Sequence, residues 1–390
     1  MNLVSNEPAH RGEAESAANL RVLHLHAGNM YGGVETLLHT LGRLKRLCPG
    51  MDPHFGLCFE GRLSRELMQA GATVHMLGNV RLSRPWTVLR ARRRLADLLR
   101  QQHYDAIVCH MPWPIVVFGD TRGPGRSLVF WAHGCHTGKN WMERMAQRTP
   151  PDLAICNSRF VAGTVRSLFP QVPRPVLFYP VELPESLQAA EWRAELRREQ
   201  NLGSDELVIV QVSRFDAWKG HLLHLEALAQ LKTQAKWVCW MVGGPQSPAE
   251  QTHFDEVRRT TQRLGLAGRV RFLGQRSDVS KLLAASDVFC QPNLGAEPFG
   301  IVFIEALWAG LPVVTTALGG ALEILNESCG VLTQPGDPAN LAAALDRLLH
   351  SPDLRKSLGL AGPARAKQLC DPAAQIPALS HLLQQTVRTA

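Results

Sequence analysis

The sequence predicts an α/β protein of two doubly wound domains, each built on a mostly parallel sheet covered by helices. Short apolar strands alternate with helical segments in both halves of the chain, which is the pattern of such sheets. A length of 390 residues exceeds what one core of ordinary size accommodates. A proline-rich stretch over residues 170–184 separates the halves and is typical of a stiff connector.

Several of the predicted strands are apolar on both faces, as expected for strands buried in a parallel sheet. In the first half we expect strands at residues 20–26, 53–59, 73–77, 106–110, 127–133 and 153–157. In the second half we expect them at residues 207–213, 237–242, 270–273, 288–291 and 312–315. Ligands bind at the carboxyl ends of such strands, so two facing domains would share one cleft.

These elements predict four segments along the chain. Residues 1–19 are polar, carry both charge signs and lack the apolar middle of a signal peptide, so we expect a disordered tail. Residues 20–182 form the predicted first domain and residues 183–370 the second. Residues 371–390 are predicted to form a C-terminal helix that packs back on the first domain.

The composition is that of a globular protein. Hydrophobic residues make up 45% of the chain and charged residues 19%, without an apolar run long enough to span a membrane. Nine cysteines, with no Cys-x-x-Cys pair, are expected to be buried thiols of a cytoplasmic protein. His133, Cys135 and His136 lack partners at metal-ligand spacing, so no metal site is predicted.

The positive charge is concentrated in the first half. Residues 1–180 carry a net charge of +10 and residues 181–390 a net charge of −2. A cluster of Arg90, Arg92, Arg93 and Arg94 lies in a predicted helix over residues 86–102. Two interpretations stay open, a solvated helix face and a peripheral contact with an anionic membrane at its inner surface. No nucleic-acid partner is expected, because no binding motif accompanies the charge.

The most informative stretch places two carboxylates around the start of a predicted helix. Pro298 and Gly300 interrupt the preceding strand, and residues 301–311 are mostly apolar. Glu297 is therefore expected in the loop and Glu305 about one turn into the helix. The unpaired N–H groups at this helix start would face the cleft, where a phosphate can dock. The spacing predicts a sugar-nucleotide site.

Three further motifs directly follow predicted strands. Gly32 and Gly33 allow the backbone to approach a ligand, although the dinucleotide fingerprint Gly-x-Gly-x-x-Gly is absent. Arg214 and Lys219 offer two cations that can neutralise a diphosphate. His133 can donate a hydrogen bond to a sugar hydroxyl. Taken singly, each motif also has a structural interpretation: a tight turn, two surface cations and a core histidine.

Together these segments resemble the retaining glycosyltransferases of family four, which have the GT-B fold. The resemblance covers roughly residues 20–370. One departure stands in the segment Gln291 to Gly295, where the family often has a serine after the proline. The matching features are the Glu-x7-Glu signature (Glu297 to Glu305), the phosphate-binding pair (Arg214, Lys219), the glycine-rich first loop (Gly32, Gly33), and the landmarks Asn157-Ser158, Tyr179-Pro180-Val181 and Gly319 to Glu323.

The resemblance implies a role for residues on both sides of the cleft. Glu305 would bind the ribose hydroxyls of the donor, and Glu297 would contact the donor sugar. The diphosphate would be held by Arg214 and Lys219. The remaining implied contacts are the amides of Phe299, Gly300 and Ile301 with the diphosphate, His133 with the donor sugar's hydroxyls, Gly32 and Gly33 with the phosphates across the cleft, and Gly274, Gln275 and Arg276 with the nucleobase.

The implied reaction moves a sugar from a UDP- or GDP-sugar to a hydroxyl of a glycan or lipid-linked acceptor, in polysaccharide or glycolipid synthesis, and keeps the anomeric configuration. The chain contains no Asp-x-Asp, so we expect cations and helix ends to replace a metal, with no cofactor besides the donor. Two alternatives stay open: a sugar-nucleotide epimerase or phosphorylase on the same architecture, and an inactive protein that binds a sugar nucleotide or glycan.

Overall fold

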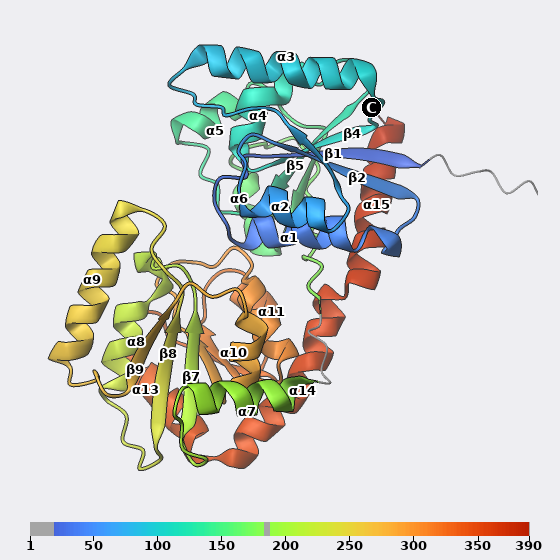
Figure 1. Ribbon diagram of the computed structural model, residues 1–390. Helices are drawn as coiled ribbons and strands as arrows, with labels where there is room; N and C mark the ends of the chain where they lie inside the picture. The colour runs from blue at the N-terminus through green and yellow to red at the C-terminus, as the bar shows by residue number, and fades with distance from the viewer. Residues whose placement is uncertain (1–18, 183–187, 390) are drawn as a thin grey trace, which may run out of the picture.

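The computed structural model describes residues 19–182 and 188–389 and contains two α/β domains, one above the other in Figure 1. Each domain has one six-stranded sheet, which confirms the predicted fold class of two doubly wound domains. The predicted tail, except for Asn19, and residues 183–187 at the predicted domain boundary lie outside the described residues.

The first sheet has the strand order β3-β2-β1-β4-β5-β6, and all neighbouring strands run parallel. Its strands are β1 (Leu20–His26), β2 (Met51–Leu57), β3 (Thr73–Met76), β4 (Ala106–His110), β5 (Ser127–Ala132) and β6 (Leu153–Cys156). The helices are α1 (Gly33–Arg43), η1 (Lys45–Leu47), α2 (Arg62–Gln69), α3 (Pro85–Gln101), α4 (Pro112–Phe118), η2 (Gly119–Thr121), α5 (Trp141–Ala146) and α6 (Arg159–Val165).

The second sheet has the order β12-β11-β10-β7-β8-β9 and is also parallel. Its strands are β7 (Leu207–Val212), β8 (Trp237–Val242), β9 (Val270–Gly274), β10 (Val288–Gln291), β11 (Val313–Thr316) and β12 (Gly330–Thr333). The helices are α7 (Ala189–Glu199), η4 (Ala217–Lys219), α8 (His221–Leu228), α9 (Pro248–Arg263), α10 (Val279–Ala285), α11 (Ile301–Trp308), α12 (Ala321–Ile324), α13 (Pro338–His350), α14 (Pro352–Cys370) and α15 (Pro372–Thr389).

The predicted strands agree with the structure except at one sheet edge. Strands β5 and β8 are buried along their whole length, which explains their mostly apolar sequences. Strand β12 was not predicted. It has four residues at the edge of the sheet, and Leu332 within it is 37% exposed, so the sequence there lacks a long apolar run.

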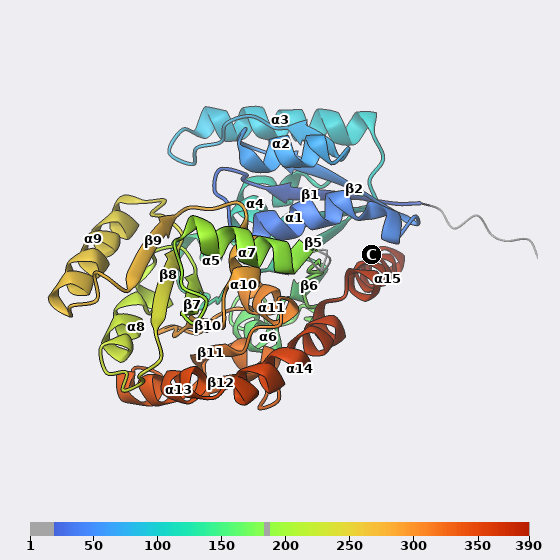
Figure 2. The same cartoon turned by 60° about the horizontal axis from the view of Figure 1, so that its bottom comes forward.

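The last two helices cross from the second domain back to the first. Helix α14 packs against α11, and α15 packs against η1 of the first domain, along one side of both domains (Figures 1 and 2). The junction is tied by the N–H of Val181, which donates to the carbonyl of Cys370 at 2.9 Å. Arg43 and Glu182 form an ion pair close by. Over the described ranges, no helix combines the length and apolar character needed to cross a membrane.

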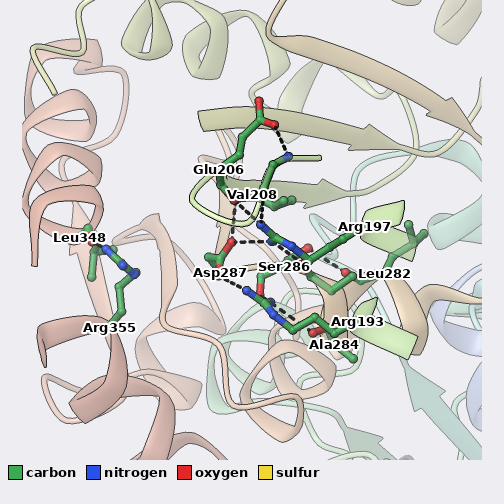
Figure 3. A network of polar contacts seen from close by, with 12 residues as sticks. Arg193, Arg197, Glu206, Val208, Leu282, Ala284, Ser286, Asp287, Leu348 and Arg355 are labelled. Carbon is green, nitrogen blue, oxygen red and sulfur yellow. Dashed lines mark hydrogen bonds and ion pairs between the residues drawn. The ribbon is translucent and has the colours of Figure 1, made fainter. Parts of the chain in front are cut away.

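A polar network fixes the first helix of the second domain to the base of its sheet (Figure 3). Arg193 of α7 donates to Asp287 at 2.6 Å, and Arg197 lies 3.3 Å from the other oxygen of the same carboxylate. Asp287 also accepts the N–H of Val208 at 2.7 Å. Asp287 and Val208 stand at the amino ends of β10 and β7, so this network holds the domain together at the edge opposite to the ligand-binding edge.

Candidate active site

A cleft of about 560 Å³ lies between the carboxyl ends of the two sheets and takes its walls from both domains. Every predicted site residue except Gly274 lines it. Gly274 ends β9 in a left-handed conformation (φ +67°) and is exposed beside the wall. The predicted residues that line the cleft are Gly32, Gly33, His133, Arg214, Lys219, Gln275, Arg276, Glu297, Phe299, Gly300, Ile301 and Glu305.

The start of α11 forms one wall of the cleft. Gly300 precedes the helix with φ +99°, and a Cβ at this position would lie 2.5 Å from the ring of Phe303, so only glycine fits. No side chain caps this helix start. The cleft wall includes Gly300, Ile301 and Val302, so the first N–H groups of α11 are placed to bind an anion.

Glu297 is held by a cation and two amides. Its Oε2 lies 2.7 Å from Lys219 Nζ and accepts from Asn293 Nδ2 at 3.0 Å and Gln291 Nε2 at 3.4 Å. The ammonium of Lys219 also sits 3.9 Å from the ring centre of Trp218. The carboxylate is 8% exposed, so its charge needs these partners. Asn293 belongs to the segment that departs from the family pattern.

Arg214 is likewise paired with carboxylates. Its Nη1 donates to Glu250 Oε1 at 2.9 Å, and its Nη2 donates to Asp216. Glu250 lies in the first turn of α9, so this ion pair joins the loop after β7 to a separate helix. Both predicted phosphate-binding cations are therefore already in ion pairs, and a diphosphate entering the cleft must compete with these carboxylates.

Glu305 is a half-buried carboxyl of the site. Burial raises its pKa to about 7. Near neutral pH the group is therefore divided between the carboxylic acid and the carboxylate. It lines the cleft from α11, one helical turn beyond Ile301, as the sequence predicted.

The glycine-rich first loop reaches across the cleft to α11. A Cβ on Gly33 would lie 3.2 Å from Ile301 Cδ1, so the lack of a side chain lets the two domains approach closely here. Two residues further along α1, the carboxylate of Glu35 lies 2.8 Å from His26 Nε2. Both side chains are buried, and they fix the end of β1 to the start of α1.

His133 stands in a chain of buried polar groups. Its Nε2 lies 2.8 Å from His110 Nδ1, and His110 Nε2 lies 3.0 Å from His24 Nδ1. Its Nδ1 contacts the hydroxyl of Tyr179, which also accepts from Asn157 Nδ2 at 3.0 Å. Burial lowers the pKa of His133 and His110 well below the usual value, and that of His24 to about 3. The three rings are therefore neutral at pH 7.

These contacts fit a chain of donation that runs from Asn157 to His24. The Tyr179 oxygen accepts from Asn157, and in this arrangement its hydrogen points to His133 Nδ1. His133 then donates from Nε2 to His110, and His110 donates from Nε2 to His24. Both ring nitrogens of His133 thus have partners inside the first domain. His133 lines the cleft, but a sugar hydroxyl would have to displace a partner to bond its ring.

The residues that orient the predicted groups were not found from the sequence. Glu250 gave no signal, since it lies 36 positions from Arg214 and no pattern connects the two. Asn157 entered only as a landmark of the family resemblance, without a role of its own. For Asn293 a signal existed, because it stands in the segment that departs from the family pattern four residues before Glu297.

Comparison with known proteins assigns each domain to a family model. Residues 31–179 match the model described as Glycosyltransferase Family 4, and residues 193–365 match the model described as Glycosyl transferases group 1. The boundary between the two matches falls at the crossing between the two sheets, and the second match contains every cleft residue from Arg214 to Glu305.

Two curated relatives and a solved structure illustrate the likeness. Alpha-1,3/1,6-mannosyltransferase ALG2 of Homo sapiens is 28% identical over 298 residues, which cover 71% of this chain and 67% of that protein. The lipopolysaccharide core biosynthesis glycosyltransferase LpsD of Rhizobium meliloti is 26% identical over 88% of this chain and 92% of its own length. The crystal structure of Anabaena HepE with UDP and glucose superposes with a TM-score of 0.81 at 24% identity, covering 94% of this chain and all of that one.

Proposed function

The chain belongs to glycosyltransferase family four and has the GT-B fold, and on that premise we propose that it is a retaining enzyme that transfers a sugar from a UDP- or GDP-sugar to a hydroxyl. One observation carries this proposal. The pair Lys219–Glu297, the guanidinium of Arg214 and the uncapped start of α11 meet in one cleft between the domains. Glu305 stands one helical turn further along α11.

The proposed reaction uses these groups to stabilise the leaving diphosphate. The acceptor oxygen attacks the anomeric carbon on the face from which the diphosphate departs. The bond from that carbon to the phosphate oxygen breaks, and the acceptor's proton passes to the departing phosphate oxygen. Arg214, Lys219 and the N–H groups of α11 face the negative charge that develops there, so no metal ion is needed. Glu297, released from Lys219, accepts a hydrogen bond from a hydroxyl of the donor sugar.

The nucleoside of the donor would lie along the second domain. Glu305 accepts hydrogen bonds from the ribose hydroxyls, and the loop of Gln275 and Arg276 lies beside the base. Gly274 does not line the cleft, but its left-handed backbone forms the turn that leads into this loop. Uridine as the base is supported by the fold neighbour HepE, which was crystallised with UDP and glucose. His133 faces the donor sugar from the first domain, oriented by Tyr179 and His110.

The acceptor is proposed to be a glycan or a lipid-linked sugar. The name of the relative LpsD, a lipopolysaccharide core glycosyltransferase, supports this class. A peripheral contact with an anionic membrane would bring the enzyme to such an acceptor. Of the basic cluster on α3, Arg90, Arg93 and Arg94 are exposed, whereas Arg92 is turned inward and donates to the carbonyl of Val116 at 3.1 Å.

A panel of nucleotide sugars tests the proposed transfer. The purified protein is incubated with UDP- and GDP-sugars, with and without simple glycosides as acceptors, and its thermal unfolding is followed in parallel. We expect one nucleotide diphosphate to raise the melting temperature and its sugar to be consumed mainly when an acceptor is present. Conversion of the donor into another nucleotide sugar without acceptor would instead identify an epimerase. Stabilisation without turnover of any donor would favour a binding protein.

A further inference from the structure

A second cavity, of about 730 Å³, opens in the first domain beside the transfer cleft. It lies at the carboxyl ends of β2 and β3 and is bordered by α3, the helix along the outer side of the domain in Figure 1. Its polar lining comprises Glu60, Asn79, Thr87, Arg90 and Arg94, and its largest apolar side chain is Trp86. Among the described residues, Glu60 is the only carboxylate that lines this cavity.

Three of these residues form a stripe on one face of α3. Trp86, Arg90 and Arg94 are four positions apart, so they follow one another along the helix on the same side. Trp86 is 66% exposed, although an indole of this size is usually covered. The stripe therefore presents an aromatic face and two guanidinium groups to the same space.

The two guanidinium groups are free to bind a ligand. Among the described residues, no hydrogen bond or ion pair is found for the side chain of Arg90 or Arg94. The backbone makes room for one of them. Gly78 has φ +96°, and a Cβ there would lie 2.4 Å from Arg94 Nη1, so the guanidinium rests directly against the backbone at the cavity wall. By contrast, Arg93 is exposed and does not line the cavity.

The cavity and the transfer cleft take wall residues from the same short segment of the chain. The segment after β2 contributes Glu60 to the cavity and, two residues later, Arg62 to the cleft. This segment is fixed to the loop after β1, because the N–H groups of Cys58 and Phe59 both donate to the carbonyl of Ala27, at 3.1 and 3.0 Å. An acceptor that uses both the cavity and the cleft would have to be longer than one sugar.

We propose that this cavity binds an anionic sugar unit of the acceptor, one that carries a phosphate or a carboxylate, next to the unit that receives the transferred sugar. Arg90 and Arg94 bind the anionic group in charge-assisted hydrogen bonds, Trp86 packs on the apolar face of the ring, and Glu60 and Asn79 take its hydroxyls. The proposal rests on the transferase function proposed above, whose acceptor it makes more specific.

A sugar-binding experiment separates this site from a general attraction of the basic helix. Glucose 6-phosphate, glucuronate, methyl glucoside and inorganic phosphate are titrated into the full-length protein and followed by ligand-observed NMR and calorimetry. The variants are Arg90→Gln, Arg94→Gln and Trp86→Ala. Arg93→Gln is the matched control, because it removes the same charge from the same helix outside the cavity. UDP and GDP are titrated into every variant to report on the donor site independently.

We expect the charged sugars to bind at least tenfold tighter than methyl glucoside, and each cavity arginine to contribute about tenfold or more. Trp86→Ala should weaken sugars but not inorganic phosphate, and Arg93→Gln should leave all affinities unchanged. Equal binding of charged and neutral sugars to the wild type would overturn the proposal. So would an equal loss in Arg93→Gln and Arg90→Gln. If the variants lose sugar binding but still bind UDP or GDP, the donor site is intact. A negative result for the cavity is then distinct from a failure of the proposed transferase function.

A vesicle arm distinguishes the two sources of an anionic sugar. Vesicles of phosphatidylcholine with phosphatidylinositol are compared by sedimentation with vesicles of equal charge that contain phosphatidylglycerol. Preference for phosphatidylinositol that is lost in Arg94→Gln and kept in Arg93→Gln would support the site and assign it to a lipid headgroup. Binding of soluble glucose 6-phosphate with no vesicle preference supports the site and assigns it to a soluble acceptor. Vesicle binding that falls equally in both variants, without sugar binding, makes the helix a membrane-surface element and overturns the proposal.

Discussion

The N–H of Phe160 donates to Glu323 Oε1 at 2.8 Å, so a carboxylate of the second domain caps α6 of the first domain. The other oxygen of Glu323 accepts the N–H of Arg159 at 2.9 Å. Next to them, Ser158 Oγ donates to the carbonyl of Pro298 at 2.6 Å, directly beside Glu297. The contact between the two domains therefore lies one residue from Glu297 of the proposed active site. The negative charge of Glu323 at the start of α6 stabilises this contact.

Glu323→Ala should loosen this contact. Loss of a charged helix cap costs about 1 kcal/mol. This free energy corresponds to a several-fold change in an equilibrium constant, so we expect the KM for the donor to rise several-fold while the fold is kept. Small-angle scattering should show a larger radius of gyration in the absence of ligand. Glu327→Ala, an exposed glutamate on the following loop, is the control. An unchanged KM and radius in Glu323→Ala would show that the contact does not hold the domains together.

Lys219→Ala should reduce turnover by about 10²-fold or more, because it removes a cation worth roughly 2–4 kcal/mol to the leaving diphosphate. It also leaves the buried Glu297 with only the amides of Asn293 and Gln291. The measurement is kcat and kcat/KM with a saturating acceptor, with circular dichroism to confirm folding. The exposed Lys232→Ala is the control and should retain activity. Wild-type turnover by Lys219→Ala would exclude its assignment to the diphosphate.

The sequence predicted those parts of the site that depend on local chain geometry. Gly300 and the apolar run after it define the start of α11 by themselves, since only glycine adopts the backbone needed there. The partners of the charged groups depend on the packing of distant segments. Lys219 and Glu297 are 78 positions apart, and Arg214 and Glu250 are 36 apart. No local pattern shows such pairs, so the sequence did not predict that both cations of the site are already in ion pairs.

Donor binding should depend on the ionisation of Glu305. Burial raises its pKa from 4.5 to about 7, so the folded protein keeps this proton at pH values where the unfolded chain has lost it. The stabilising effect of that proton is complete below the unfolded pKa and is lost as pH rises to about 7. If the carboxylate accepts the ribose hydroxyls, affinity for an intact nucleotide sugar should instead increase as pH rises through this range.

Calorimetric titration between pH 6 and pH 8 measures this dependence, with an intact nucleotide sugar because a terminal phosphate would itself titrate near pH 6. Glu305→Gln should bind more weakly and without the pH dependence, and it should gain thermal stability relative to the wild type at pH 8. An identical pH profile in wild type and Glu305→Gln would show that another group titrates. Glu305→Ala should lower donor use by about 10²-fold.

Transfer should persist in excess chelator, because Arg214, Lys219 and the start of α11 supply the positive charge that a metal provides in other enzymes. The measurement compares initial rates in EDTA, in Mg²⁺ and in Mn²⁺ after the protein has been dialysed against chelator. We expect the three rates to agree within about twofold. Activity that disappears in EDTA and returns with either metal would contradict this account of the leaving-group stabilisation.

The buried imidazole chain should hold His133 in one tautomer. His110 stacks on His133 with 5.0 Å between ring centres and 8° between planes, so His110→Phe keeps an aromatic ring in place while removing both nitrogens. His133 Nε2–H then loses its acceptor, and an unsatisfied buried donor costs about 1–3 kcal/mol. We expect lower thermal stability and a reduced kcat, because the ring that faces the donor sugar is no longer fixed by its neighbours.

Nitrogen NMR of the histidine-labelled protein tests the direction of the chain itself. In the wild type, His133 should carry its proton on Nε2, and its ring should stay neutral when the pH is lowered to about 5, because burial lowers the pKa of this ring and of His110. His350→Phe, at the exposed end of α13, controls for the loss of an imidazole elsewhere. A proton found on His133 Nδ1 would reverse the chain and make Tyr179 an acceptor from both His133 and Asn157. In that case the tyrosine hydroxyl hydrogen would be free to point at the donor sugar.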